Sequence, residues 1–196
     1  MLLRPMLHLA LALLPASAGA TSVRSLSVRE LLARAELVFE GRSVAAEVRE
    51  EAPGGAIRTC VRFEVLEVLK GPAVTGPLEL CFAGGSVGRR TQRVHGLRVP
   101  PVGERGLYFV EDLDAPRLHP LTGWDQGRFR VRETREPAVE TADGEPVLAI
   151  EADAPAGATA LPRAARGARL AAPGGRGMAP EAFKARLRAL LAEAAP

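Results

Sequence analysis

Ser86 is the residue whose surroundings most nearly match a catalytic motif. It lies in Gly84-Gly85-Ser86-Val87-Gly88, which has the G-x-S-x-G spacing of a hydrolase nucleophile. That spacing works only at a sharp turn between a strand and a helix, which exposes the serine and binds the oxyanion. A strand-like run precedes the motif, but residues 89–93 after it show no helical periodicity. We therefore predict a flexible glycine loop, with a hydrolase that uses Gly84–Gly88 as the alternative.

Two histidines have the side chains for metal binding. His95 and His119 would need Asp112 or Asp114 as further ligands, and the chain has no tight ligand spacing such as H-E-x-x-H or C-x-x-C. Each histidine stands beside a glycine or a proline, as in a turn. Solvated loop histidines are the simpler interpretation. We therefore expect neither a metal site nor another cofactor.

Arginine is concentrated in two segments. The first is the loop of residues 84–104, which carries Arg89, Arg90, Arg93 and Arg98. The second alternates along an expected strand, and it carries Arg128, Arg130 and Arg132. Either set could bind an acidic partner or an anionic surface polymer. A solvated polar face balanced by Glu133 and Glu136 is the simpler interpretation. If the protein is a binding module, the long loop of residues 84–104 is the expected contact surface, so the four loop arginines are the predicted binding residues.

The charge balance argues against nucleic acid as a partner. The net charge is only +3, and acidic residues are interspersed among the basic ones. Proteins that bind nucleic acid usually gather their basic residues on one face.

Cys60 and Cys81 are the only cysteines of the chain. In an oxidising compartment such a pair is expected to form a disulfide, and each cysteine alternates with charged residues on the polar face of its strand. The expected register resists the pairing, because a simple hairpin around residues 71–77 places Cys60 well beyond the residue opposite Cys81. We predict the disulfide, formed through a bend or another strand pairing, with two separate buried thiols as the alternative.

The first residues have the pattern of an export signal. Arg4 gives a positive start, residues 6–14 are apolar except for His8, and small residues follow up to Ala20. This pattern predicts a signal peptide over residues 1–20, with Thr21 or Gly19 as the mature start. The apolar run is shorter than the roughly 20 residues that cross a bilayer. We expect a periplasmic or secreted protein with no transmembrane segment after cleavage.

The sequence after the signal alternates like a β-rich domain. Ser27 and Glu30 form a capping box that begins a short helix. At Leu66 the apolar phase slips by one residue, which predicts a β-bulge. The strands are expected at residues 37–48, 57–69, 78–82, 107–110 and 126–132, with a hairpin over 139–150 about Asp143-Gly144. The strand at 107–110 is apolar on both faces, which predicts a central position in the sheet.

The aromatic residues indicate a core and not a platform for a ligand. The members assigned to the core are Phe63, Phe82, Phe109 and Phe129. Phe39 belongs to the first expected strand and Phe183 to the apolar stripe of the C-terminal helix, so only Trp124 and Tyr108 are left over. We expect Trp124 to lie at the rim of the core.

The chain is thus expected to contain four parts. They are a signal peptide (residues 1–20), a β-barrel-like domain (21–150), a flexible Ala/Gly/Pro linker (151–179) and an amphipathic helix (180–196). The predicted fold class is mainly β: a small OB-like barrel or a sandwich, with a short N-terminal helix and a C-terminal helix after the linker.

Four short runs carry a resemblance to known proteins. They are residues 35–44, 61–71, 103–109 and 126–131, and together they resemble an uncharacterised family of secreted bacterial proteins. The strand that ends in Leu69-Lys70-Gly71 also resembles the netrin-like OB-barrel domain of the tissue inhibitors of metalloproteinases. That resemblance implies a five-stranded barrel with flanking helices. Those inhibitors block a zinc ion with a mature N-terminal cysteine, and a chain that begins at Thr21 or Gly19 does not have one.

These observations favour a secreted, non-enzymatic binding module of the bacterial cell envelope. Its expected partner is a protein, and the resemblance to inhibitors suggests a protease as one candidate. The alternatives are a hydrolase that uses the Gly84–Gly88 loop and a structural component of the envelope tethered by the flexible tail.

Overall fold

The computed structural model of the protein describes residues 24–152, 164–172 and 174–194. The predicted signal peptide, with both proposed mature starts, and residues 153–163 of the predicted linker lie outside the described residues. Within the described ranges, no helix is long and apolar enough to cross a membrane.

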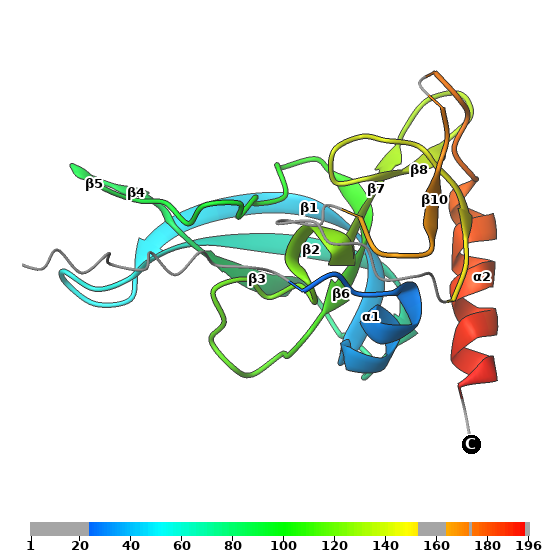
Figure 1. Ribbon diagram of the computed structural model, residues 1–196. Coiled ribbons are helices and arrows are strands. Elements are labelled where there is room, and N and C mark those ends of the chain that lie inside the picture. Colours follow the sequence, from blue (N-terminus) through cyan, green and yellow to red (C-terminus); the bar gives the residue numbers. More distant parts are fainter. Residues whose placement is uncertain (1–23, 153–163, 173, 195–196) are drawn as a thin grey trace, which may run out of the picture.

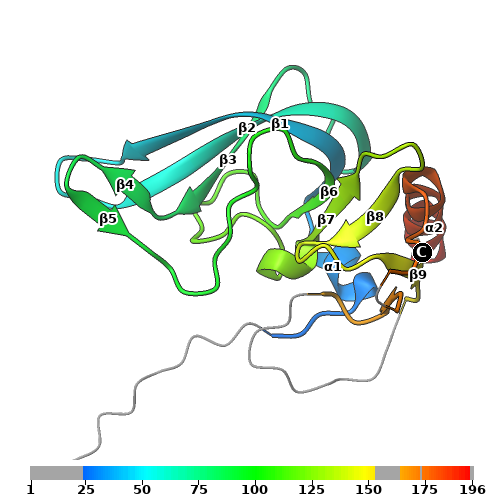
Figure 2. The same ribbon diagram turned by 90° about the horizontal axis from the view of Figure 1, so that it is seen from above.

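A six-stranded antiparallel sheet forms the body of the protein (Figures 1 and 2). Its strand order is β3-β2-β1-β6-β7-β8. The strands are β1 (Leu37–Glu50), β2 (Ile57–Lys70), β3 (Leu78–Ala83), β6 (Arg105–Val110), β7 (Arg128–Arg132) and β8 (Ala138–Thr141). The predicted mainly β fold with two helices is confirmed. The outer strands β3 and β8 do not pair with each other, so the sheet is no closed barrel and is consistent with a small sandwich.

Each face of the sheet packs on its own apolar core. One core packs α1 (Val28–Arg34) and α2 (Pro180–Glu193) onto the sheet. The other core fills the opposite face, and its aromatic members are Phe39, Phe63, Phe82 and Tyr108. Alternate residues of β6 enter the two cores, as the period of a strand dictates. β6 is therefore the central strand that its apolar sequence predicted.

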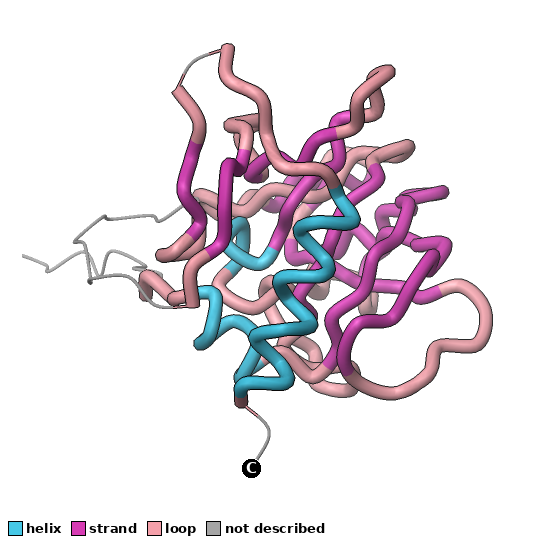
Figure 3. The backbone as a smooth tube through the Cα atoms, turned by 90° about the vertical axis from the view of Figure 1, so that its right-hand side faces the viewer, coloured by secondary structure: helices cyan, strands magenta, loops and turns pink. Residues whose placement is uncertain are grey.

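Both predicted helices are present. The hydroxyl of Ser27 accepts from the Glu30 amide at 3.1 Å, and the Glu30 carboxylate accepts from the Ser27 amide at 2.8 Å, so the capping box is confirmed. α2 begins at Pro180 and buries Phe183 and Leu187 against the sheet. Figure 3 shows α2 in front of the strands that it covers. The C-terminal helix is thus part of the folded unit.

The two longest strands bend at irregularities in their pairing. Glu40 pairs with Glu67 but Gly41 pairs with Val65, so Leu66 is the extra residue of a bulge, as predicted. A side chain at Gly41 would place its Cβ 2.9 Å from the carbonyl oxygen of Glu64, so the bend needs glycine there. Beyond it, residues 44–62 of β1 and β2 continue away from the helices as a curved hairpin, whose base pairs with β3 (Figures 1 and 2). We call this hairpin the arm.

The chain after β8 departs from the predicted hairpin and linker. It turns at Asp143-Gly144 as expected, but β9 (Val147–Ile150) then pairs with β10 (Ala168–Leu170) in a separate small sheet. A further bridge joins Ser27 to Arg166. Residues 164–172, which we predicted to be flexible linker, therefore belong to the folded unit, because their backbone groups pair with β9 and with the segment before α1.

Candidate protein-interaction surface

The segment predicted as a flexible glycine loop begins with a small β-hairpin. β4 (Gly85–Val87) pairs with β5 (Arg90–Gln92), and the Ser86 and Thr91 hydroxyls lie 2.9 Å apart across the pair. A hydrolase serine needs a strand followed by a helix, whereas Ser86 is followed by a turn and a second strand. The described fold therefore lacks the elbow that the hydrolase alternative requires.

The β4–β5 hairpin is fixed to the arm by hydrogen bonds in both directions. The Gly84 amide donates to the carbonyl of Ile57 at 2.7 Å, and the Ile57 amide donates to the side chain of Gln92 at 2.9 Å. The hydroxyl of Thr59 donates to the Gly84 carbonyl at 2.8 Å. A Cβ at Gly85 would lie 2.6 Å from the side chain of Val48, so only glycine lets the hairpin pack this closely. Hairpin and arm thus form one rigid projection.

The four predicted binding arginines do not form one site. Arg89 and Arg93 are exposed, and neither forms an ion pair with another described residue. Arg90 is exposed but ties the hairpin to the arm, because it pairs with Glu50 and donates to the Gly54 carbonyl at 3.1 Å. These three arginines lie at the projecting hairpin, whereas Arg98 lies in the body.

Arg98 joins its own loop to the short 3-10 helix Trp124–Gly127 and to the turn at Asp143. Its guanidinium donates to Asp125 at 2.8 Å and to Asp143 at 2.5 Å. Burial raises the pKa of the Asp125 carboxyl, and the bonds from Arg98 act in the opposite direction. Because both carboxylates neutralise Arg98, its charge holds the loop of residues 93–104 onto the body and is not available to a partner.

The alternating arginines also differ from the prediction. Arg128 was expected on a solvated face, but it is buried and donates to both carboxylate oxygens of Glu104, at 2.8 and 2.5 Å. The hydroxyl of Tyr108 donates to the same carboxylate at 3.1 Å, and burial raises the pKa of Tyr108. Arg132 is exposed and pairs with Glu140 at 3.0 Å. The negative charges that pair with these arginines come from Glu104 and Glu140, and not from the predicted Glu133 and Glu136.

His119 is buried, contrary to the predicted solvated loop position. Its Nδ1 accepts from the Leu121 amide at 3.2 Å, and its ring stacks on Trp124 with 5.4 Å between centroids. Burial lowers the pKa of His119 to about 3. Trp124 is only partly buried, as the predicted rim position requires, and it has a positive φ of 62°, which is strained for a bulky residue.

The histidines and aspartates that were considered as metal ligands do not come together. His95 is exposed while His119 is buried, and the Asp112 carboxylate caps its own loop by accepting from the amides of Asp114 and Ala115. These amide hydrogen bonds hold the pKa of Asp112 below its usual range. Within the described ranges, the one group with ligand atoms close enough for a metal is Cys60, Glu79 and Cys81. Both of its sulfurs are already joined to each other.

The predicted disulfide joins Cys60 to Cys81, and the register that seemed to oppose it was wrong. Cys60 lies directly opposite Cys81, and Phe63 lies opposite Leu78, so β2 extends beyond β3 as far as Lys70. The connection of residues 71–77 therefore runs back beside β2 instead of closing a tight hairpin. It contains Pro72 and Pro77, which lack the amide hydrogen needed for a continuous ladder.

A cleft of about 280 Å³ runs beside the disulfide along the outer edge of β3. One wall is β3 from Glu79 to Cys81, and the other is the loop of residues 113–117. Arg58 closes one end, because it donates to the Arg117 carbonyl at 2.7 Å. The cleft and the projecting hairpin lie next to each other, since β3 leads directly into β4.

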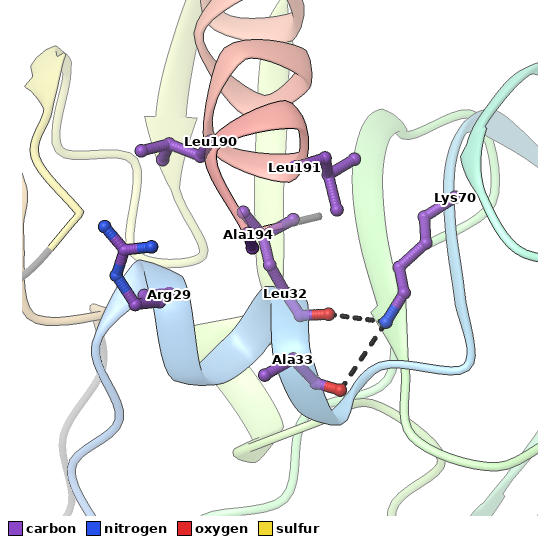
Figure 4. A pocket seen from close by; sticks show the side chains of 7 residues that line it. All are labelled: Arg29, Leu32, Ala33, Lys70, Leu190, Leu191 and Ala194. Atoms are coloured by element: carbon purple, nitrogen blue, oxygen red, sulfur yellow. Dashed lines mark hydrogen bonds between the residues drawn. The ribbon is translucent and has the colours of Figure 1, made fainter. Parts of the chain in front are cut away.

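A second hollow of about 320 Å³ lies between the two helices (Figure 4). Leu32, Leu190 and Leu191 give it a mainly apolar lining. Lys70 reaches its rim, but its ammonium donates to the carbonyls of Leu32 and Ala35 at 2.6 Å each. Burial lowers the pKa of Lys70. These bonds complete the C-terminal end of α1, so the hollow offers no charged anchor for a ligand from Lys70.

Comparison with known proteins does not extend this description. No protein family matches the chain, and neither a curated protein nor a solved structure shows significant similarity to it. The class defined by the fold is thus a small mainly β protein with a disulfide, a projecting arm and an adjacent cleft.

Proposed function

We propose that this protein is an exported module that binds a protein partner in the cell envelope, and that the partner contacts the projecting β4–β5 hairpin. The observation that carries the proposal is that Arg89 and Arg93 are exposed and form no ion pair with another described residue. Arg89 lies in the turn of the hairpin, and Arg93 directly follows β5. Exposed arginines beside a hydrogen-bonded hairpin are well suited to charge-assisted bonds with acidic groups of a partner.

Binding accounts for these features better than catalysis does. Ser86 pairs with Thr91 in a hairpin, and His119 is buried against Trp124. A hydrolase needs its serine and its base within hydrogen-bond reach of each other. The β4–β5 hairpin has no such pair among the described residues, but it presents the charges of Arg89 and Arg93 beside the arm, which favours specific recognition.

Reversal of the two free charges tests the proposal. Arg89→Glu with Arg93→Glu should abolish the capture of a specific partner from envelope extract, with the partner identified by mass spectrometry and rebound in purified form. The control is Arg34→Glu with Arg135→Glu, which makes the same change of net charge at exposed positions elsewhere. Equal capture by both double variants, or hydrolytic activity that Ser86→Ala abolishes, would contradict the proposal.

A further inference from the structure

The two edges of the sheet differ in how the chain covers them. At β8, the Val139 amide donates to the Met178 carbonyl and the Thr141 amide donates to the Glu145 carbonyl, both at 2.9 Å. The backbone edge of β8 is therefore occupied by the chain itself. At β3, one such bond is present, from the Ala83 amide to the Leu118 carbonyl at 2.8 Å.

The register of β3 identifies the backbone groups that face outward. The Gly84 amide donates to the Ile57 carbonyl of β2, so the backbone groups of Phe82 and Leu80 also point toward β2. Those of Ala83, Cys81 and Glu79 point to the outer edge. The bond from Ala83 to Leu118 agrees with this alternation. Among the described residues, the backbone N–H and C=O of Glu79 and Cys81 have no hydrogen-bond partner on that side.

These open groups line the cleft between β3 and residues 113–117. Glu79 and Cys81 are about 7 Å apart along the strand, which is the repeat at which one side of an extended peptide presents its own N–H and C=O. The cleft volume of about 280 Å³ suits a short extended segment between two walls. The edge strand of another folded sheet would not fit there, because the loop of residues 113–117 occupies the space that the rest of that sheet would need.

The cleft is lined by charges of both signs, and most of them are already paired. Arg58 pairs with Glu51, Glu79 pairs with Arg49, and Arg117 pairs with Asp112. Of the charged residues that line the cleft, only Asp114 forms no ion pair with another described residue, so the side chains offer an occupant at most one unpaired carboxylate. Recognition in this cleft falls mainly to the backbone groups, which is how strand addition to a sheet edge gains its affinity.

We propose that the β3 edge binds an extended peptide segment of a protein partner, which adds to the sheet as a further strand beside Glu79 and Cys81. This inference rests on the proposed function, since it identifies the kind of segment that the partner supplies. The disulfide holds β3 to β2 at the position where the segment adds. The loop wall is fixed as well, because the Asp112 carboxylate accepts from the Asp114 and Ala115 amides at 2.9 and 2.8 Å.

Proline at the edge tests the inference with little change to the fold. Glu79→Pro removes an outward N–H that β2 does not use, whereas Glu79→Ala removes the same side chain and keeps the N–H. The probe is a phage-displayed library of random dodecapeptides, selected on the full-length protein. Selected peptides should lose at least about tenfold in affinity for Glu79→Pro and keep their affinity for Glu79→Ala. Hydrogen exchange should show new protection of the Glu79 and Cys81 amides in the complex.

Selected peptides that bind both variants equally, or that leave the two amides unprotected, would overturn the inference. So would a selection that yields no peptide dependent on the Glu79 amide. The failure of the proposed function has a different signature, since it concerns the natural partner and the charges of Arg89 and Arg93. If the charge reversals abolish partner capture while Glu79→Pro leaves it unchanged, the binding function stands and the added strand is wrong.

Discussion

Lys184 joins α2 to the sheet through a buried ion pair, and its replacement tests the docking of that helix. Its ammonium lies 2.7 Å from the carboxylates of Glu40, Glu67 and Glu181. We predict that Lys184→Met lowers the free energy of unfolding by about 3 kcal/mol, mainly through the charge-assisted bond to Glu40. Glu40 is 2 % exposed and Glu181 is 76 % exposed, so the latter contact adds almost nothing. Glu40 keeps Arg105 as a partner, which limits the loss.

Arg188→Met is the matched control, because it removes the same charge from the same helix. Arg188 pairs with Glu67 near the surface, where 47 % and 32 % of the two side chains are exposed. Its loss should be below about 1 kcal/mol. Urea unfolding followed by circular dichroism should show a lower midpoint at an unchanged slope for Lys184→Met. If Lys184→Met costs no more than Arg188→Met, or shows no coupling to Glu40→Gln in a double-mutant cycle, the reasoning is refuted.

Three further predictions concern the cysteines, the buried histidine and the N-terminus. Reduction of Cys60–Cys81, which are 21 residues apart, should lower the free energy of unfolding by about 3 kcal/mol, and Cys60→Ala with Cys81→Ala should reproduce this in the same urea assay. The His119 ring should remain neutral in nuclear magnetic resonance spectra until the pH falls to its pKa of about 3. Because the unfolded chain takes up this proton near pH 6.5, the free energy of unfolding should decrease by about 1.4 kcal/mol for each pH unit as the pH falls from 6.5 to 3, and His119→Gln should remove that part of the slope. N-terminal sequencing of the exported protein should find Thr21 or Gly19, and an intact Met1 would contradict the signal peptide.

Local sequence signals predicted the local features of the fold. The spacing of Ser27 and Glu30 gave a capping box because both partners lie within one helical turn. The slip of apolar phase at Leu66 gave a bulge because side chains alternate strictly along a strand. The run of apolar residues in β6 gave a central strand because both of its faces are covered.

Features that depend on distant residues could not be predicted in this way. Arg128 follows the alternation of an outward residue, yet it is buried because Glu104, from before β6, supplies both acceptors. Lys184 lies on the side of α2 that meets Glu40, 144 positions away. Charge alternation identifies the face of an element, but the partner that makes burial favourable comes from tertiary packing. The four loop arginines do not form one site for the same reason: Arg98 is bonded to Asp125 and Asp143, which come from later parts of the chain.

The arrangement of the arm, the disulfide and the β3 edge gives one physical account of how this protein would hold a partner. A free sheet edge tends to pair with any exposed strand, so proteins usually shorten, charge or cover such edges. Here β3 is short, Glu79 is charged, and the loop ending at Leu118 covers the edge only at Ala83. What remains open is a short length of backbone beside a fixed wall. Arg89 and Arg93 stand on the hairpin that follows directly, so a partner segment entering the cleft would also need acidic groups near the arm. A partner would therefore need both an extended segment for the β3 edge and acidic groups for Arg89 and Arg93, and few proteins would meet both requirements.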